Sequence, residues 1–306
     1  MHSINRPGNM KLSRYLQSKE ILNTITQNKY IDARSYILHK GEEWFLDNPQ
    51  EIEIIKSNLE QLNLSYSEDL IIKIKKNIIL HYFEKLIAFF WSPKTFHTWL
   101  REVIDGKEEV DVLENSLNKG KGTLVAISHF GGVELISPWL STYKFPLNVV
   151  LRFTTKEFSE ASFKRACKLT ESGYFGPLNF IEIGKPDTIS ALDMAASLRR
   201  KEVLVSVFDE KTEFSRSVKL FNTNIWGGAG LDKLIFLSRV NISLFVAFLI
   251  RTNGNRYRFK LIEIDGTDNN PVQSMYEILE RIISTHLDQW YFLHEEIPFN
   301  KNVRDI

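Results

Sequence analysis

The feature that most constrains the fold of this chain is an alternation, from Gly122 onward, between short apolar, β-branched runs and longer segments of helical spacing. A strand buried on both faces reads as a continuous apolar run, whereas an amphipathic helix repeats its apolar residues every three or four positions. Alternating strands and helices favour a parallel sheet covered by helices. We therefore expect an α/β fold with a mixed, largely parallel central sheet flanked by helices.

The expected strands are TLVAIS (123–128), LNVVLRF (147–153), NFIEI (179–183), VLVSVF (203–208), SVKLF (217–221), SLFVAFLIRT (243–252) and YRFKLIEI (257–264). The last two are expected to pair as a hairpin through RTNGNR (251–256). Helical periodicity separates the strands, and the final helix is predicted over 271–293, with Pro271 near its first turn.

The chain before this region has a different pattern. From about Lys11 to Ile104, apolar residues return at three- and four-residue spacing and strand signals are scarce. We predict a helical N-terminal region over 1–105 and an α/β core over 106–306, packed as one compact unit.

Composition excludes several classes of protein. The 39 Lys and Arg residues nearly balance the 38 Asp and Glu residues, so the whole chain has no strong attraction to nucleic acid. Cys167 is the single cysteine, which excludes an intramolecular disulfide and thiolate metal clusters. No apolar run approaches the roughly 18 residues of a spanning helix, and the N-terminus lacks the apolar region of a signal peptide. We expect a cytoplasmic protein.

The segment from His129 to Glu134 contains the candidate catalytic residues. His129 ends a strand, and Glu134 follows five positions later, after Gly131 and Gly132. Sites in open α/β sheets lie beyond the carboxyl ends of the strands. Residues five apart on one helix point about 140° apart, so the two side chains can meet only if His129 precedes the helix. The glycines permit that turn, and we expect the Glu134 carboxylate to reach Nδ1 and leave Nε2 as a base. A hydrogen-bonded structural histidine and a carboxylate in a first helical turn are the alternative interpretation.

HFGGVE (129–134) resembles the H-x-x-x-x-D/E signature of glycerolipid and lipid A acyltransferases. The segments that follow resemble, in order, those of the lipid A late acyltransferase family, the lauroyl and myristoyl transferases. They are VVLRF (149–153), FKRACKLTESG (163–173), LRRKEVLVSVFDEK (198–211), SVKLFNTNIWGGAGLDKLIFLS (217–238) and DQWYFLHEEIPF (288–299). The resemblance covers residues 50–299 and implies a glycerolipid-acyltransferase-like fold.

The resemblance implies transfer of a fatty acyl group from an acyl carrier protein or coenzyme A thioester to a hydroxyl or amine. No cofactor is implied beyond that acyl donor. His129 would remove the acceptor's proton, and Glu134 would orient the imidazole. Arg165, or alternatively Arg152, would hold the developing oxyanion or the thioester. Asp209 matches the family's aspartate and is a further expected site residue.

This sequence differs from the family pattern at positions that affect which acyl acceptor is expected. The spanning helix of the membrane lauroyltransferases has no counterpart here, and the family's basic His-Arg-Arg terminus is replaced by His294-Glu295-Glu296. Less positive charge disfavours an anionic phosphosugar lipid, so we favour a small-molecule or carrier-tethered intermediate of specialised metabolism. A peripheral membrane enzyme of the lipid A or lysolipid type is the alternative, as is a non-catalytic lipid- or partner-binding protein on the same scaffold.

Other sites fit the sequence poorly. The loop after Trp226 has neither the lysine nor the Ser/Thr of a phosphate-binding loop, so Trp226 is expected to border the acyl slot or to have no functional role. Peptide-synthetase condensation domains need a second histidine where Ser128 stands. The chain has no H-E-x-x-H motif, and we expect no metal site.

Overall fold

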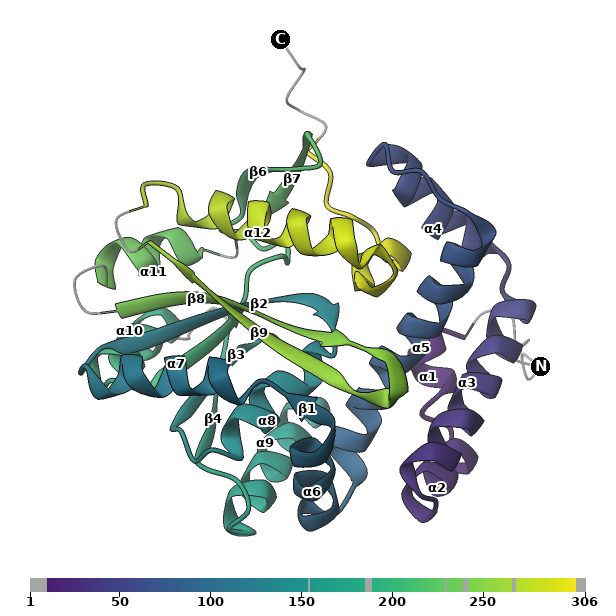
Figure 1. Ribbon diagram of the computed structural model, residues 1–306, viewed down its shortest axis with the longest axis horizontal. Helices are drawn as coiled ribbons and strands as arrows, with labels where there is room; N and C mark the ends of the chain where they lie inside the picture. The colour runs from purple at the N-terminus through teal and green to yellow at the C-terminus, as the bar shows by residue number, and fades with distance from the viewer. Residues whose placement is uncertain are drawn as a thin grey trace.

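The computed structural model describes residues 10–153, 155–184, 189–228, 230–238, 242–265 and 268–300. At its centre is a seven-stranded sheet of order β1-β9-β8-β2-β5-β3-β4, with helices packed on both sides (Figure 1). The strands are β1 (Ile104–Asp105), β2 (Gly122–Gly131), β3 (Leu147–Leu151), β4 (Leu178–Glu182), β5 (Val203–Val207), β8 (Ile242–Arg251) and β9 (Tyr257–Ile264). All neighbouring pairs are parallel except the β8/β9 hairpin. The predicted mixed, largely parallel sheet is confirmed.

The central strands read as continuous apolar runs because helices cover both of their faces. In β2 the side chains of Leu124, Val125 and Ala126 are fully buried, and β5 and β8 flank this strand. The outer strand β9 instead alternates exposed and buried residues over its first half. Burial on both faces therefore identifies the middle of the sheet, where β2 and β5 lie side by side.

Side-chain caps mark the start of three helices, α5, α6 and α9. Ser67 accepts a hydrogen bond from the backbone of Leu70 at the start of α5, and Thr155 accepts one from Phe158 at the start of α9. The helices are α1 (Leu12–Tyr15), α2 (Lys19–Gln27), α3 (Tyr30–Asp47), α4 (Gln50–Gln61), α5 (Glu68–Phe90), α6 (Pro93–Val103), α7 (Lys107–Asn118), α8 (Ile136–Ser141), α9 (Lys156–Glu171), α10 (Ser190–Arg199), α11 (Leu231–Ser238) and α12 (Pro271–Thr285).

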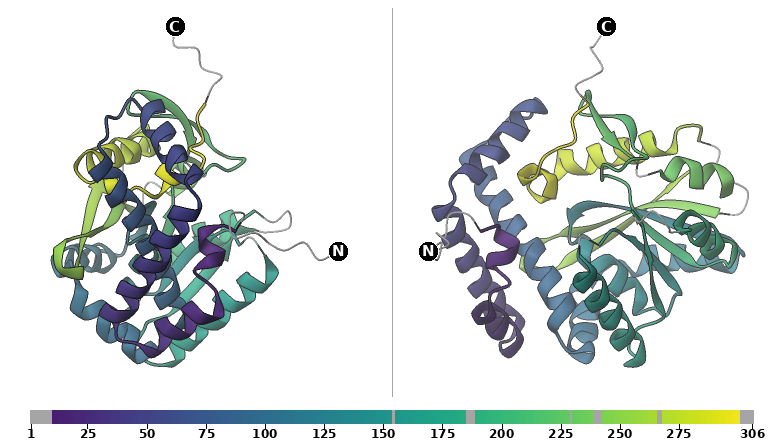
Figure 2. Two further views of the ribbon diagram at one scale, coloured as in Figure 1. Left: turned by 90° about the vertical axis from the view of Figure 1, so that its right-hand side faces the viewer. Right: turned by 180° about the vertical axis from the view of Figure 1, so that it is seen from behind.

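The N-terminal helices α1 to α5 form a layer at one end of the sheet (Figure 2). Of these, α5 packs against α2, α3 and α4 and also reaches the 3₁₀ turns at Val133–Leu135, Leu287–Gln289 and Tyr291–His294. The predicted boundary at residue 105 falls inside β1, which pairs with β9. Because α5 lies between the first four helices and the core, it supplies side chains to the site.

Two local predictions differ from the structure. The final helix ends at Thr285 instead of continuing to 293, because His286 leaves the helical region with φ −144° and ψ 51°. A strand over Thr223–Gly227, β7, was not predicted; it pairs antiparallel with β6 (Arg216–Leu220) in a separate two-stranded sheet. Trp226 lies on this hairpin.

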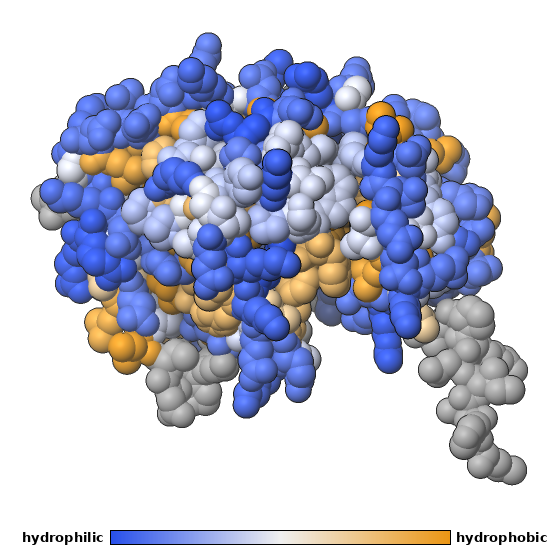
Figure 3. Space-filling model, turned by 90° about the horizontal axis from the view of Figure 1, so that it is seen from below, coloured by the Kyte–Doolittle hydropathy of each residue, from blue (hydrophilic) through white to orange (hydrophobic). Residues whose placement is uncertain are grey.

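Within the part of the chain that the structure describes, no helix combines the length and apolar character needed to cross a membrane. Seen from below, the surface is mostly hydrophilic with apolar patches between the polar side chains (Figure 3). Phe158 and Phe163 on α9 are among the large apolar side chains that remain exposed.

Candidate functional site

His129 and Asp209 are brought together by two adjacent parallel strands. Ile127 of β2 pairs with Val207 of β5, and each chain then continues for two residues to His129 and Asp209. Neighbouring strands lie about 4.8 Å apart, so the side chain of His129, which is still inside β2, can touch that of Asp209, which lies just past the end of β5. Nδ1 of His129 lies 2.9 Å from Oδ1 of Asp209, and the backbone N–H of His129 donates to Oδ2 at 2.8 Å. Both carboxylate oxygens of Asp209 therefore hold this one residue.

The predicted contact between Glu134 and Nδ1 of His129 is wrong. The chain does turn at Gly131, whose φ of +56° is in the left-handed region that favours glycine, and an added Cβ would lie 2.1 Å from the Leu249 carbonyl oxygen. The segment after it begins as a 3₁₀ turn, which directs Glu134 towards α5. There Oε1 of Glu134 lies 3.4 Å from Nζ of Lys85 and 3.6 Å from Nε2 of His81.

Gly132 plays a smaller part in this turn. Its φ is −83°, which other residues also adopt, and its N–H donates to the Leu249 carbonyl at 2.7 Å. A Cβ at this position would lie 3.0 Å from the ring of Tyr257. The close approach of that ring favours a residue without a side chain at position 132.

The second imidazole nitrogen of His129 also faces a carboxylate. Nε2 lies 3.4 Å from Oε1 of Glu210, the residue after Asp209. Burial lowers the pKa of His129, but the charge and hydrogen bond of Asp209, followed by the charges of Glu210 and Glu134, outweigh burial and raise it to about 9. In the ligand-free protein the imidazole is thus mainly protonated at neutral pH.

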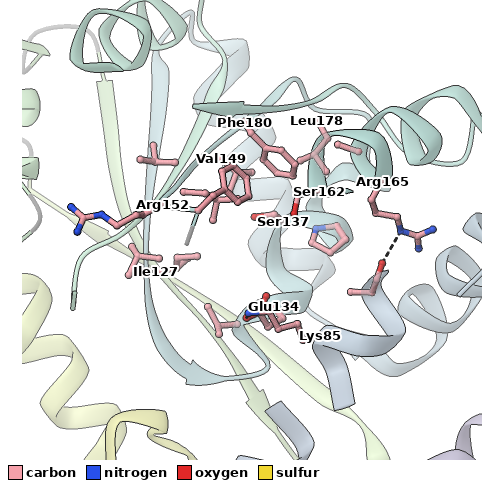
Figure 4. Close-up of a pocket in the computed structure, with 18 of the residues that line it drawn as sticks. Lys85, Ile127, Glu134, Ser137, Val149, Arg152, Ser162, Arg165, Leu178 and Phe180 are labelled. Carbon is pink, nitrogen blue, oxygen red and sulfur yellow. Dashed lines mark hydrogen bonds and ion pairs between the residues drawn. The ribbon is translucent and has the colours of Figure 1, made fainter. Parts of the chain in front are cut away.

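His129 borders a cavity of about 300 Å³ whose wall is largely apolar. Apolar side chains from β3, β4, α5 and α9 form most of the wall, and Glu134, Glu210, Lys85, Ser137 and Ser162 are among its polar members (Figure 4). The ring centroid of Phe292 lies 4.9 Å from that of the imidazole. The His129 imidazole, which can act as a base or an acid, therefore borders a space suited to a hydrocarbon chain.

The two candidate arginines lie on opposite sides of this cavity, and neither is a hydrogen-bond partner of His129 among the described residues. The guanidinium of Arg152 is exposed and points away from the other labelled residues (Figure 4). Arg165 donates from Nε to the Ala88 carbonyl at 2.9 Å, and its Nη2 is buried without a hydrogen bond. Burial lowers the pKa of Arg165 to about 10. The predicted oxyanion role of these residues stays a prediction.

Trp226 does not line the cavity. Its backbone N–H donates to the Pro298 carbonyl at 2.7 Å, so in the structure it joins the β6/β7 hairpin to the C-terminal segment. Trp226 was expected either to border the acyl slot or to have no functional role, and the structure does not place it in the lining of the cavity beside His129.

A buried ion pair supports the turn after His129. Glu84 of α5 is fully buried and accepts hydrogen bonds from Nε and Nη2 of Arg251, each at 2.6 Å, and from Tyr257 Oη at 2.8 Å. Nη2 of Arg251 also donates to the Gly131 carbonyl at 2.8 Å. A paired and fully hydrogen-bonded charge of this kind is costly to break, so it fixes the backbone that follows His129.

Sequence reasoning missed several residues around the site. Glu210 follows Asp209 directly and was assigned no role, although its position beyond a buried strand was a usable signal. His81, Lys85 and Tyr291 come from distant segments that meet only in the fold. The ring of His81 lies 4.2 Å from that of Tyr291, and burial holds the pKa of His81 well below its usual range.

No protein-family model and no curated protein matches this chain. Among the described residues, no group of three or more His, Cys, Asp or Glu side chains is arranged to hold a metal ion.

Proposed function

We propose that this chain is an acyltransferase that moves a fatty acyl group from an acyl carrier protein or coenzyme A thioester to the hydroxyl or amine of an acceptor. The observation that carries the proposal is the position of His129. Asp209 holds Nδ1 and the backbone N–H, while Nε2 lies beside Glu210 at the wall of a largely apolar cavity. A fixed imidazole next to space for an acyl chain supports acyl transfer.

In the proposed reaction, neutral His129 accepts the acceptor's proton at Nε2 as the acceptor oxygen or nitrogen forms a bond to the thioester carbonyl carbon. The carbon–sulfur bond then breaks, and the proton passes from the imidazolium to the departing thiolate. Asp209 keeps the proton of Nδ1 in place and stabilises the imidazolium that forms. This role was predicted for Glu134 and is reassigned to Asp209 because Asp209 makes the contact.

The pKa of His129 has a consequence for this reaction. With a pKa of about 9, only about one molecule in a hundred has the neutral imidazole at pH 7. An acceptor that displaces Glu210 from Nε2 removes one of the charges that stabilise the imidazolium. An acyl chain that excludes water from the cavity lowers the pKa further by desolvation. Substrate binding therefore favours the base form.

For the acceptor we favour a small-molecule or carrier-tethered intermediate. The carboxylates of Glu134 and Glu210 at the cavity wall repel an anionic headgroup, and Lys85 is paired with the first of them. A phosphosugar lipid presented at a membrane surface remains the second candidate for the acceptor, because exposed aromatic side chains such as Phe90 and Phe158 lie on α5 and α9, the helices that also line the cavity.

The test is acyl transfer from a panel of acyl carrier protein and coenzyme A thioesters, followed by thiol release and by mass of the acylated product. His129→Ala is expected to lower turnover by about 10² to 10⁴. The control is His39→Ala, because His39 is exposed on α3 and pairs with Glu43. Turnover that is unaffected by His129→Ala contradicts the proposal. Saturable thioester binding without turnover in the wild type favours a lipid- or partner-binding protein.

A further inference from the structure

A second cavity lies apart from the one beside His129. It has a volume of about 600 Å³ and is enclosed by the N-terminal helices on one side and by the segment around His294 on the other. The two cavities share no lining residue. Asn58 of α4 fastens the two sides together, since its Nδ2 donates to the carbonyls of Leu293 and Glu295 at 3.0 and 2.9 Å. These hydrogen bonds hold the two walls of the cavity in a fixed position relative to one another.

Both walls carry carboxylates. Glu51 and Glu53 come from α4, and Glu295 and Glu296 follow His294, whereas Lys11 is the basic residue of the lining. Burial raises the pKa of the Glu51 carboxyl, and the charge of Glu295 raises it further. The two walls thus repel one another electrostatically, and a cation placed between them would relieve that repulsion.

A buried acceptor adds to these charges. His294 is 8% exposed and lines the cavity, and its Nδ1 lies 2.7 Å from the Tyr291 carbonyl, which places the ring proton on Nδ1. Burial lowers the pKa of His294, although Glu295 raises it, so Nε2 is an unprotonated acceptor at neutral pH. Oε1 of Glu295 lies 3.8 Å from Nε2, and a carboxylate oxygen cannot donate to it. No hydrogen bond links Nε2 to another described residue, and because His294 lines the cavity this nitrogen is open to a donor from a ligand or from water.

The rest of the lining is suited to a carbon chain. Trp44 and Tyr82 present aromatic rings, and the indole N–H of Trp44 is already used by the Met10 carbonyl at 2.9 Å. The hydroxyl of Tyr82 is likewise 2.6 Å from that of Tyr291. With their polar atoms satisfied, these rings offer apolar and π surface, which attracts organic cations.

We propose that this cavity binds an aliphatic amine in its ammonium form, with the N–H groups donating to Glu51, Glu295 and Nε2 of His294. The carbon chain lies against Trp44 and Tyr82. This inference does not depend on the acyltransferase proposal, because it concerns a separate cavity and a binding event without chemistry.

The test uses n-hexylamine at pH 7 and compares it with 1-hexanol, which has the same carbon chain and no charge. Dissociation constants are measured by ligand-observed NMR on the full chain. Hexylammonium is expected to bind saturably and at least tenfold more tightly than 1-hexanol. Glu51→Gln and Glu295→Gln are each expected to weaken hexylammonium binding at least threefold.

The matched control is Glu160→Gln, which removes the same charge from the exposed face of α9 and is expected to leave binding unchanged. Thermal melting establishes that each variant is folded, and if Glu295→Gln is not, Glu51→Gln carries the test. Equal affinity for 1-hexanol overturns the proposal. So does unchanged binding in the folded Glu51→Gln variant, which would place the amine elsewhere, such as beside Glu134 and Glu210.

Discussion

Asp209→Asn tests the assignment of Asp209 as the residue that holds His129. The change keeps the shape of the side chain, which is 3% exposed, but removes its charge. One of the two carboxylate oxygens becomes an NH₂ group, so the variant cannot accept from both Nδ1–H and the backbone N–H of His129. We expect the pKa of His129 to fall from about 9 towards or below its ordinary value of 6.5, because burial then outweighs the remaining charges.

The size of the effect follows from linkage between protonation and folding. A pKa of about 9 in the folded state against 6.5 in the unfolded state corresponds to about 3 kcal/mol, at about 1.4 kcal/mol per pH unit. Because the folded pKa is the higher one, this stabilisation is fully present below pH 6.5 and is lost as the pH rises through about 9. The wild type should therefore lose about 3 kcal/mol more than the variant between pH 6 and pH 9.5.

The measurement is the free energy of urea unfolding of both proteins at pH 6 and at pH 9.5. The change between the two pH values is compared between the wild type and the variant, so the contributions of titrating groups that both proteins share cancel. An NMR titration of the His129 ring gives the pKa directly. Glu134→Gln is the matched control, and it should lower the pKa by much less because Glu134 does not contact the imidazole. Equal pH dependence in the wild type and Asp209→Asn, with the ring still titrating near 9, would refute the reasoning.

Three further predictions concern the same site. The kcat/KM for the thioester should rise with pH up to about 9, because the neutral imidazole of His129 is the base. A kcat/KM that does not change between pH 6 and pH 9 excludes that role. Gly131→Ala should destabilise the protein by at least about 2 kcal/mol in urea unfolding, whereas Gly173→Ala, with φ +74° and open space around it, should cost about 1 kcal/mol. Arg165→Ala should lower turnover more than Arg152→Ala, and if neither change lowers it, both arginine assignments fail.

Much of the fold was predictable because its signals are local. Continuous apolar runs marked β2, β5 and β8, and the glycine pair marked the turn after His129, where Gly131 does adopt a positive φ. The strand β7 was missed because TNIWG is short and carries no alternating pattern. The end of α12 was misplaced because apolar residues continue with helical spacing into the 3₁₀ turns at Leu287–Gln289 and Tyr291–His294, which are partly buried.

The sequence by itself determined that His129 lies near the end of a buried strand and that a carboxylate follows another, since each position follows from a run of apolar residues; in the structure β2 continues past His129 to Gly131. It did not determine which carboxylate reaches the imidazole. Glu134 is near in the chain, whereas Asp209 is 80 residues away. Only the tertiary structure decided for Asp209, because the order of strands places β5 directly beside β2, with Ile127 opposite Val207, and turns Glu134 towards Lys85 and His81 of α5.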